Sequence, residues 1–173
     1  LLVGPRLSGN VEAIGPAQML RQGETIWEYT GWRVAMPVEP ASADNAKGAA
    51  AAIGYALRHP VATLTLMLAR VGVHVAHVRP YYSRAHNLAI VAWLLPIYAL
   101  AAYGAWILRR HVLTRWCAVV IATQTLVVAL THADWDGRYL AHVLPLVYPF
   151  AGCGVALLAA QWWPPTSGVA VAR

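Results

Sequence analysis

Charged residues are scarce in this sequence: only 12% of its 173 residues are Asp, Glu, Lys or Arg, whereas 59% are hydrophobic. Soluble domains average about a quarter charged residues and about half apolar ones. The few charges are also unbalanced, because 13 basic residues face 7 acidic ones and the net charge is +6. The composition excludes an ordinary soluble domain and predicts an integral membrane protein whose excess positive charge faces anionic lipid headgroups or an anionic lipid-linked substrate.

The short motifs of common soluble enzymes are also missing. The sequence contains no glycine-rich phosphate loop, no HExxH, no CxxC and no GxSxG. Its basic residues are scattered and are not interleaved with exposed aromatics, so nucleic acid is not an expected partner. The two cysteines, Cys117 and Cys153, lie inside apolar runs, where cysteine behaves as a small hydrophobe. They therefore indicate no disulfide.

The first residues are LLVG, without a methionine and without a basic segment ahead of a long apolar run. A signal peptide needs both features. We therefore expect the sequence to be a piece of a longer protein whose membrane entry lies upstream of Leu1.

Three long apolar runs predict transmembrane helices. Residues 88–108 and 140–160 carry no formal charge, and a helix of that length is about 31 Å long, which matches the hydrocarbon core of a bilayer. Val112–Leu130 returns between them. Gly152 and Ala156 in the last run have the spacing that lets helices pack closely. The expected fold is all-α and polytopic, with about three transmembrane helices.

The rest of the chain is predicted to lie outside the hydrocarbon core. Residues 1–47 are rich in glycine and proline and predict an external loop region with one short helix at Pro16–Gln22. Residues 48–87 predict interfacial amphipathic helices that break at Pro60. Residues 161–173 predict a cytoplasmic tail. One polar stripe in 48–87 predicts a helix face toward water or a wet cavity. Its members are His59, Thr63, Arg70, His74 and His77.

The orientation follows from the basic turn at 109–115, which contains three arginines and a histidine. By the positive-inside rule this turn is cytoplasmic. Residues 1–87 and 131–139 are then extracytoplasmic, and a bacterial inner or plasma membrane is the expected location.

Candidate chemistry is concentrated at 131–139, THADWDGRY, because Asp134, Asp136 and Arg138 are the only formal charges between Arg115 and Arg173. A charge buried unpaired in hydrocarbon costs about 3 kcal/mol on the milder scales, so this segment must lie at a membrane surface or in a wet cavity. Its carboxylates could ligate a divalent cation or accept a hydroxyl proton, and its arginine could clamp a phosphate. The alternative is an ordinary solvated hairpin with an aspartate–arginine pair.

The histidines of the stripe offer a second site. Paired histidines on membrane helices can hold a haem by their imidazoles. Axial ligation needs an opposing histidine at similar depth, and only His132 and His142 are available, both at a membrane edge. An interfacial helix face is the simpler interpretation of the stripe.

The chain resembles GT-C-type membrane glycosyltransferases, of the protein mannosyltransferase and aminoarabinose transferase kind, over their C-terminal half. The resemblance is carried by YALRHPVATLTLMLARVGVHVAHVRPYYSRAHN at 55–87 and by DGRYLAHVLPLVYPFAGCGVALL at 136–158. In that family an arginine-histidine-proline helix lies at the outer face, and a later loop ends in an arginine–tyrosine pair that opens a proline-containing span. The matching residues here are Arg58, His59 and Pro60, followed by Arg138, Tyr139 and Pro145.

The resemblance implies transfer of a sugar from a polyprenyl-phosphate donor to an acceptor outside the cytoplasm. It places the catalytic aspartate in a first external loop, upstream of Leu1, and it requires no cofactor, although a divalent metal stays open. Membrane lipid and the lipid-linked sugar are the expected partners. The residues expected to bind the donor are Arg138, Tyr139, Asp134, Asp136, Arg84 and His86. The alternatives are a non-catalytic membrane scaffold subunit and a haem-binding electron-transfer subunit, which a Soret absorbance band in the purified protein would reveal.

Overall fold

The computed structural model describes residues 16–27, 29, 31–39 and 48–162. The regular elements of these residues are all helices. Two isolated β-bridges pair Glu24 with Arg33 and Ile26 with Ala133 in the connecting segments. The all-α fold predicted from the sequence is therefore confirmed for these residues. Most of the predicted cytoplasmic tail, from residue 163 on, lies outside the described residues. The helices are α1 (Pro16–Gln22), α3 (Ala49–Arg58), α4 (Pro60–Ala76), α5 (Arg84–Ile107), α6 (Val112–Leu130) and α7 (Arg138–Trp162).

Three of these helices are long and apolar enough to cross a membrane. α5, α6 and α7 contain 24, 19 and 25 residues, and their most apolar stretches have mean hydropathies of 1.9, 1.7 and 1.9. Only 17%, 17% and 28% of those stretches are buried inside the protein, so most of their apolar side chains face outward and need lipid around them. The chain is an integral membrane protein with three candidate spans, as the sequence predicts.

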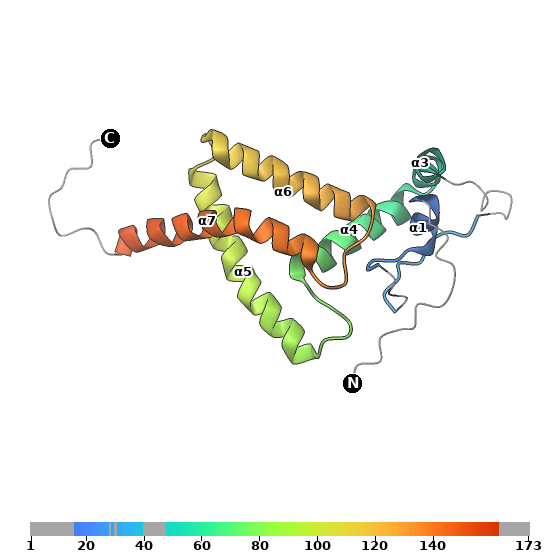
Figure 1. The fold of residues 1–173 in the computed structure, drawn as a ribbon, viewed down its shortest axis with the longest axis horizontal. Coiled ribbons are helices and arrows are strands. Elements are labelled where there is room, and N and C mark those ends of the chain that lie inside the picture. Colours follow the sequence, from blue (N-terminus) through green and yellow to red (C-terminus); the bar gives the residue numbers. More distant parts are fainter. Residues whose placement is uncertain (1–15, 28, 30, 40–47, 163–173) are drawn as a thin grey trace.

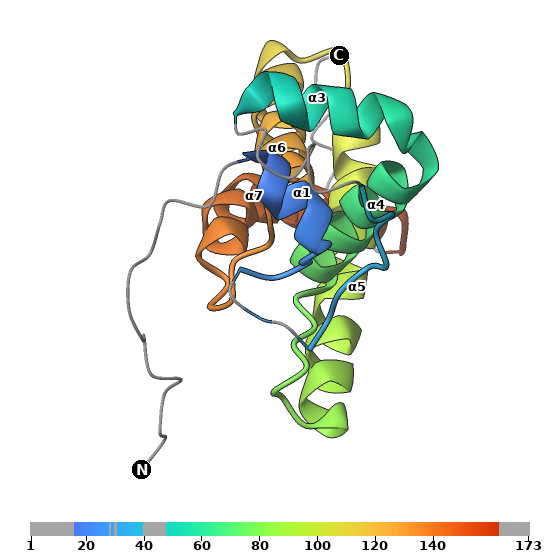
Figure 2. The same ribbon diagram turned by 90° about the vertical axis from the view of Figure 1, so that its right-hand side faces the viewer.

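Different elements lie at the two ends of the molecule. α1, α3 and α4 gather with the α6–α7 loop at one end, and the α5–α6 turn and the last turns of α7 lie at the other (Figure 1). Figure 2 shows α3 lying across the first end, above α1. Leu20, Tyr55 and Leu66 form a small buried cluster that joins α1, α3 and α4. The helix predicted at Pro16–Gln22 is thus present and packed.

α6 has the bounds predicted from the sequence, whereas α5 and α7 begin earlier than their apolar runs predict. Ser83 caps α5 by accepting a hydrogen bond from the backbone N–H of His86, at 3.1 Å. This cap draws Arg84 and His86 into the first turn, whereas the sequence predicts helix only from residue 88. α7 likewise starts at Arg138 and continues to Trp162, two residues beyond the predicted span at each end. Charged and polar residues can join a membrane helix where it leaves the hydrocarbon core.

Two glycines form the closest contact between spans. α5 and α7 cross where a Cβ added to Gly104 would lie 2.1 Å from the carbonyl oxygen of Phe150. A Cβ on Gly154 would lie 2.3 Å from the carbonyl oxygen of Leu100. The prediction that Gly152 and Ala156 mark the packing face is wrong, because Gly152 is exposed and a Cβ there would meet nothing within 4 Å.

The polar stripe of α4 faces the protein interior. The break at Pro60 occurs as predicted, since α3 ends at Arg58 and α4 begins at Pro60. However, Thr63, Arg70 and His74 are buried, with exposures of 8%, 1% and 1%. The prediction of a face toward water or a wet cavity is therefore wrong for this part of the stripe. Backbone carbonyls take the place of water around Arg70, whereas Thr63 Oγ1 and His74 Nδ1 are buried without a hydrogen-bond partner among the described residues.

Candidate functional site

The loop between α6 and α7, residues 131–137 and here called the polar loop, is held by backbone pairing with the N-terminal segment. The N–H of Ala133 donates to Thr25 O at 3.0 Å, and the N–H of Trp27 donates to Ala133 O, also at 3.0 Å. Ile26 and Ala133 are fully buried beside Val128 at the end of α6. The loop is therefore a packed element at the end of the bundle and differs from an ordinary solvated hairpin.

Arg79 lies behind the polar loop and is fully buried. Its guanidinium donates to Trp135 O at 3.1 Å, Asp134 O at 2.9 Å, Val73 O at 3.0 Å and Val78 O at 3.0 Å. A single guanidinium group thus connects the polar loop to the last turn of α4, where helix carbonyls lack partners of their own. A carboxylate oxygen of Asp134 lies 3.9 Å away, so the buried charge also has a counter-ion.

Arg70, within α4, also uses its guanidinium to bind backbone carbonyls of neighbouring segments. It donates to Ala129 O and Leu130 O, each at 3.3 Å, and therefore satisfies carbonyls at the C-terminus of α6. It also donates to Glu24 O at 3.0 Å. Burial lowers the pKa of Arg70 to about 10, and the side chain stays charged at neutral pH. Arg70 and Arg79 therefore point into the protein, whereas the composition predicts that the excess positive charge faces anionic headgroups or an anionic lipid-linked substrate.

The two aspartates of the polar loop have different partners. Asp134 is buried, and its Oδ2 accepts the backbone N–H of Tyr139 at 3.1 Å, within the first turn of α7. Asp136 accepts the Nε–H of Arg138 at 3.0 Å, and the Arg138 side chain is 76% exposed. The described part of the chain holds no group of three or more His, Cys, Asp or Glu placed to bind a metal ion.

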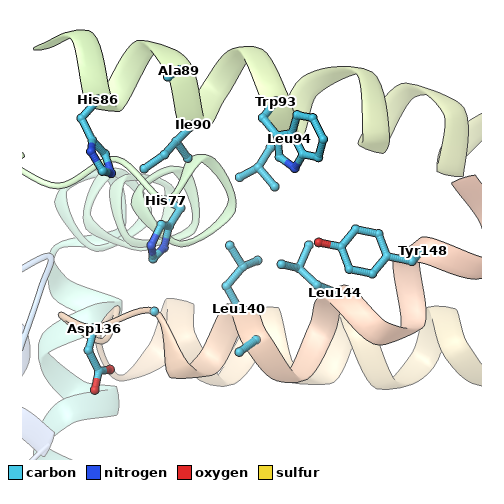
Figure 3. A pocket seen from close by; sticks show the side chains of 12 residues that line it. His77, His86, Ala89, Ile90, Trp93, Leu94, Asp136, Leu140, Leu144 and Tyr148 are labelled. Carbon is cyan, nitrogen blue, oxygen red and sulfur yellow. The ribbon is translucent and has the colours of Figure 1, made fainter.

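A groove opens between α5 and α7 beside the polar loop, with a volume of about 470 Å³. Its polar end is formed by His77, His86, Asp136 and Gly137, and its walls farther in are apolar. Figure 3 shows His86 and Trp93 on α5 facing Leu140, Leu144 and Tyr148 on α7, with His77 between the two helices at the polar end. The apolar lining consists of Ala89, Ile90, Trp93, Leu94, Leu140, Ala141, Leu144 and Tyr148.

His77 is the unusual residue at the polar end of this groove. Its φ is +51°, and no other non-glycine residue in the described part of the chain has a positive φ. Its ring lies directly on Gly137, where an added Cβ would be 2.1 Å from Cε1 of the ring. Its Nδ1 is buried and has no hydrogen-bond partner among the residues that the structure describes. Such backbone conformations for non-glycine residues are found often at functional sites.

The sequence identified part of this groove. Of the six residues expected to bind the donor, His86 and Asp136 line it. Arg138 and Tyr139 follow Gly137 directly in the chain, whereas Asp134 is turned inward toward Arg79. Arg84 is exposed at the start of α5. The other lining residues could not be predicted as parts of a site. Trp93, Leu144 and Tyr148 carry no signal beyond that of an apolar span, and His77 is recognisable only as a member of the polar stripe.

No family model, curated protein or solved structure matches this chain. Its function must therefore be argued from the groove, the polar loop and the residues around them.

Buried histidines should make the fold sensitive to acid. Burial lowers the pKa of His74, His77 and His132, so each takes up a proton more readily when unfolded, near pH 6.5. Stability present above that pH is therefore lost as the pH falls below it. We expect the thermal midpoint in detergent to fall between pH 7.5 and 5.5, a window in which ordinary carboxylates stay ionised.

The matched variants are His74→Gln and His111→Gln. His74 is 1% exposed, and its Nδ1 has no partner within the described parts of the chain, so its replacement should make the pH slope shallower whatever the stability at pH 7.5. His111 is exposed at the opposite end of the bundle and should leave the slope unchanged. Equal slopes in the parent and His74→Gln would show that His74 does not contribute.

Proposed function

We propose that the chain is the C-terminal portion of a GT-C-type membrane glycosyltransferase, and that the α5–α7 groove holds its polyprenyl-phosphate sugar donor. The groove carries the proposal: it lies between two candidate spans, is apolar along its length and has a polar end where His77, His86, Asp136 and Gly137 lie. A polyprenyl phosphate has a matching distribution of polarity, with a long apolar chain and one polar end. The resemblance in sequence at 55–87 and 136–158 supports the choice of donor.

The apolar part of the ligand fits the walls of the groove. Leu140 and Leu144 on α7 face Ile90 and Trp93 on α5 across it. An isoprenoid chain there would exchange contacts with bulk lipid for contacts with fixed side chains, so the apolar walls give shape selection more than raw affinity. Access from the bilayer is direct, because the groove opens at the surface of the bundle.

The phosphate would lie at the polar end, where several donors meet. The start of α7 supplies a partial positive charge, and its N–H groups at Arg138 and Tyr139 already donate to the carboxylates of Asp136 and Asp134. His77 and His86 supply imidazoles, and the exposed guanidinium of Arg138 is close enough in the chain to exchange Asp136 for a phosphate. A leaving phosphate gains charge in the transition state, and a guanidinium already in place stabilises it without reorganisation.

The catalytic base is assigned by the resemblance alone, to an aspartate of an external loop upstream of Leu1. Within the polar loop Asp134 is engaged by Arg79 and by the N–H of Tyr139, and Asp136 by Arg138. Their partners fit structural and positioning roles. A non-catalytic scaffold subunit is the rival function that these engaged carboxylates favour.

The proposal places the polar loop outside the cytoplasm, in a bacterial inner or plasma membrane. The α5–α6 turn carries Arg109, Arg110 and His111, which favours the cytoplasm. Single cysteines at Thr131 and His111 would be labelled by an impermeant maleimide from outside and from inside, respectively. If only position 111 were labelled from the outside, the chain would have the opposite orientation in the membrane.

Arg138 should contribute to sugar transfer because its planar guanidinium can bind a phosphate through two parallel hydrogen bonds. In an intact enzyme that includes this chain, Arg138→Lys keeps the charge but loses bidentate geometry. We expect a loss of about 1.5–3 kcal/mol of transition-state stabilisation, which is roughly a 10-fold to 150-fold lower kcat/KM. Arg84→Lys, on an exposed arginine at the start of α5, should cost under about 1 kcal/mol.

The measurement is sugar transfer from the polyprenyl donor at matched expression levels. Parent-like transfer by both Arg138→Lys and Arg138→Ala would remove Arg138 from the donor site and leave its pairing with Asp136 as a local structural contact.

A further inference from the structure

The large apolar side chains of α3 and α4 point away from the protein. Neither helix is a candidate span, yet together they expose a row of aliphatic residues spaced three or four positions apart in the sequence. The row consists of Ile53 (60% exposed), Leu57 (76%), Val61 (78%), Leu64 (56%) and Leu68 (63%). Burying one such side chain is worth about 1.5–3 kcal/mol relative to leaving it in water, so five exposed together indicate a surface that something apolar covers.

The polarity of α4 is inverted relative to a soluble amphipathic helix. Arg70 and His74 point inward, and the only exposed polar residue of α4, Thr65, donates its hydroxyl to Val61 O at 2.9 Å. The hydroxyl therefore needs no water. Internal hydrogen bonds of this kind are how Ser and Thr side chains are tolerated where a helix faces lipid.

The exposed row is continuous with a surface that already faces lipid. Between α4 and the candidate span α5 lies an apolar groove of about 420 Å³, lined by Leu68 and Val75 on α4 and by Val91 and Leu95 on α5, among others. The hydroxyl of Tyr98, inside α5, donates to Val75 O at 3.0 Å. The C-terminal half of α4 is thereby fixed against a helix whose own outward side chains require hydrocarbon.

The distribution of charge along α3 and α4 also favours lipid as their surroundings. No Asp or Glu occurs anywhere in residues 48–133, so nothing on α3, α4 or the adjoining spans repels anionic headgroups. We propose that α3 and α4 are immersed in the leaflet that carries the polar loop, with the row from Ile53 to Leu68 in contact with lipid acyl chains. This contact is independent of which ligand the α5–α7 groove binds.

The test uses the full chain in vesicles of phosphatidylcholine and phosphatidylglycerol at 3:1. With Cys117 and Cys153 replaced by serine, one nitroxide at a time is attached to a cysteine at Leu57, Leu64 or Leu68. Collision rates are then measured with oxygen, which concentrates in hydrocarbon, and with a water-soluble nickel chelate. Val119 of α6, 54% exposed, is the lipid control, and Val38, 96% exposed outside the helices, is the water control.

We expect all three positions to match Val119, with high oxygen collision rates and low nickel collision rates. Rates like those at Val38 would overturn the proposal by placing α3 and α4 in water. Low rates with both reagents would overturn it in favour of a protein partner covering the row. Labelling of the unsubstituted chain with an apolar diazirine, mapped by mass spectrometry, should modify the peptide of 49–68, and failure to do so while α6 is modified would also contradict lipid contact.

Discussion

Replacing Arg79 with alanine is expected to lower the free energy of unfolding by about 3–5 kcal/mol, the range measured when one partner of a buried charged network is removed. The side chain is fully buried and donates to four carbonyl oxygens. Without it, the carbonyls of Asp134, Val73 and Val78 lose the guanidinium as a donor, and the Asp134 carboxylate loses its counter-ion. Arg79→Lys should restore little, because one ammonium group cannot reach four separated acceptors.

The matched control is Arg138→Ala, in the same region of the fold but on a side chain that is 76% exposed. We expect it to stay within about 1 kcal/mol of the parent. Unfolding would be followed in mixed micelles by circular dichroism during titration with a denaturing detergent. If Arg79→Ala and Arg138→Ala shift the midpoint equally, the buried guanidinium does not hold the polar loop.

Gly104→Leu should separate α5 from α7. Even the Cβ of the new side chain would lie 2.1 Å from the carbonyl oxygen of Phe150 and 3.0 Å from the backbone N of Gly154, and backbone atoms of two helices cannot move aside singly. Overpacking of a well-packed contact costs about 1–3 kcal/mol, and more where backbone is involved. We expect a cost at or above the top of that range and a lower yield of folded protein in detergent.

Gly152→Leu is the control for this substitution. It makes the same change of residue in the same pair of helices, at a position where an added Cβ meets nothing within 4 Å. In a lipid-facing position leucine is also the better helix former, so stability should be unchanged or slightly higher. An unfolding midpoint for Gly104→Leu equal to that of Gly152→Leu would contradict the α5–α7 crossing.

The helices could be predicted from the sequence because each leaves a local signal. Length and the absence of charge identify α5, α6 and α7, proline marks the start of α4, and the short α1 lies between Pro16 and Gly23. Their ends are less certain because a cap such as Ser83 extends a helix beyond the apolar run that announces it.

The contacts between helices could not be predicted in the same way. A polar stripe tells which residues share one face of α4, but backbone carbonyls of α6 and the polar loop can take the place of water opposite Arg70, and a single sequence does not reveal this. The small-residue pattern has the same limitation: Gly152 and Gly154 are equally small, and only the rotation of α7 about its axis decides which one meets α5.

The candidate site was recognised in its charged part and missed in its apolar part. Asp136 and Arg138 stand out because charges are rare in the second half of the chain. Trp93 and Tyr148 do not, since any membrane helix contains such residues, and they become parts of one groove only when α5 and α7 diverge beside the polar loop.

The central proposal, that the α5–α7 groove binds a polyprenyl phosphate, is tested most directly by photo-crosslinking. The probe is a short-chain polyprenyl phosphate with a diazirine in its isoprenoid chain, added to the reconstituted chain and mapped by mass spectrometry. Ala141→Trp fills the groove from α7, and Ala122→Trp places the same side chain on the exposed surface of α6.

Adducts should concentrate on 86–94 and 140–148, compete with unlabelled polyprenyl phosphate but not with polyprenol, and fall roughly tenfold in Ala141→Trp, the equivalent of about 1.4 kcal/mol of binding. Ala122→Trp should crosslink like the parent. Adducts spread evenly over the lipid-facing sides of all three spans, with no competition and no effect of Ala141→Trp, would contradict a donor site in this groove and leave the scaffold function as the better account.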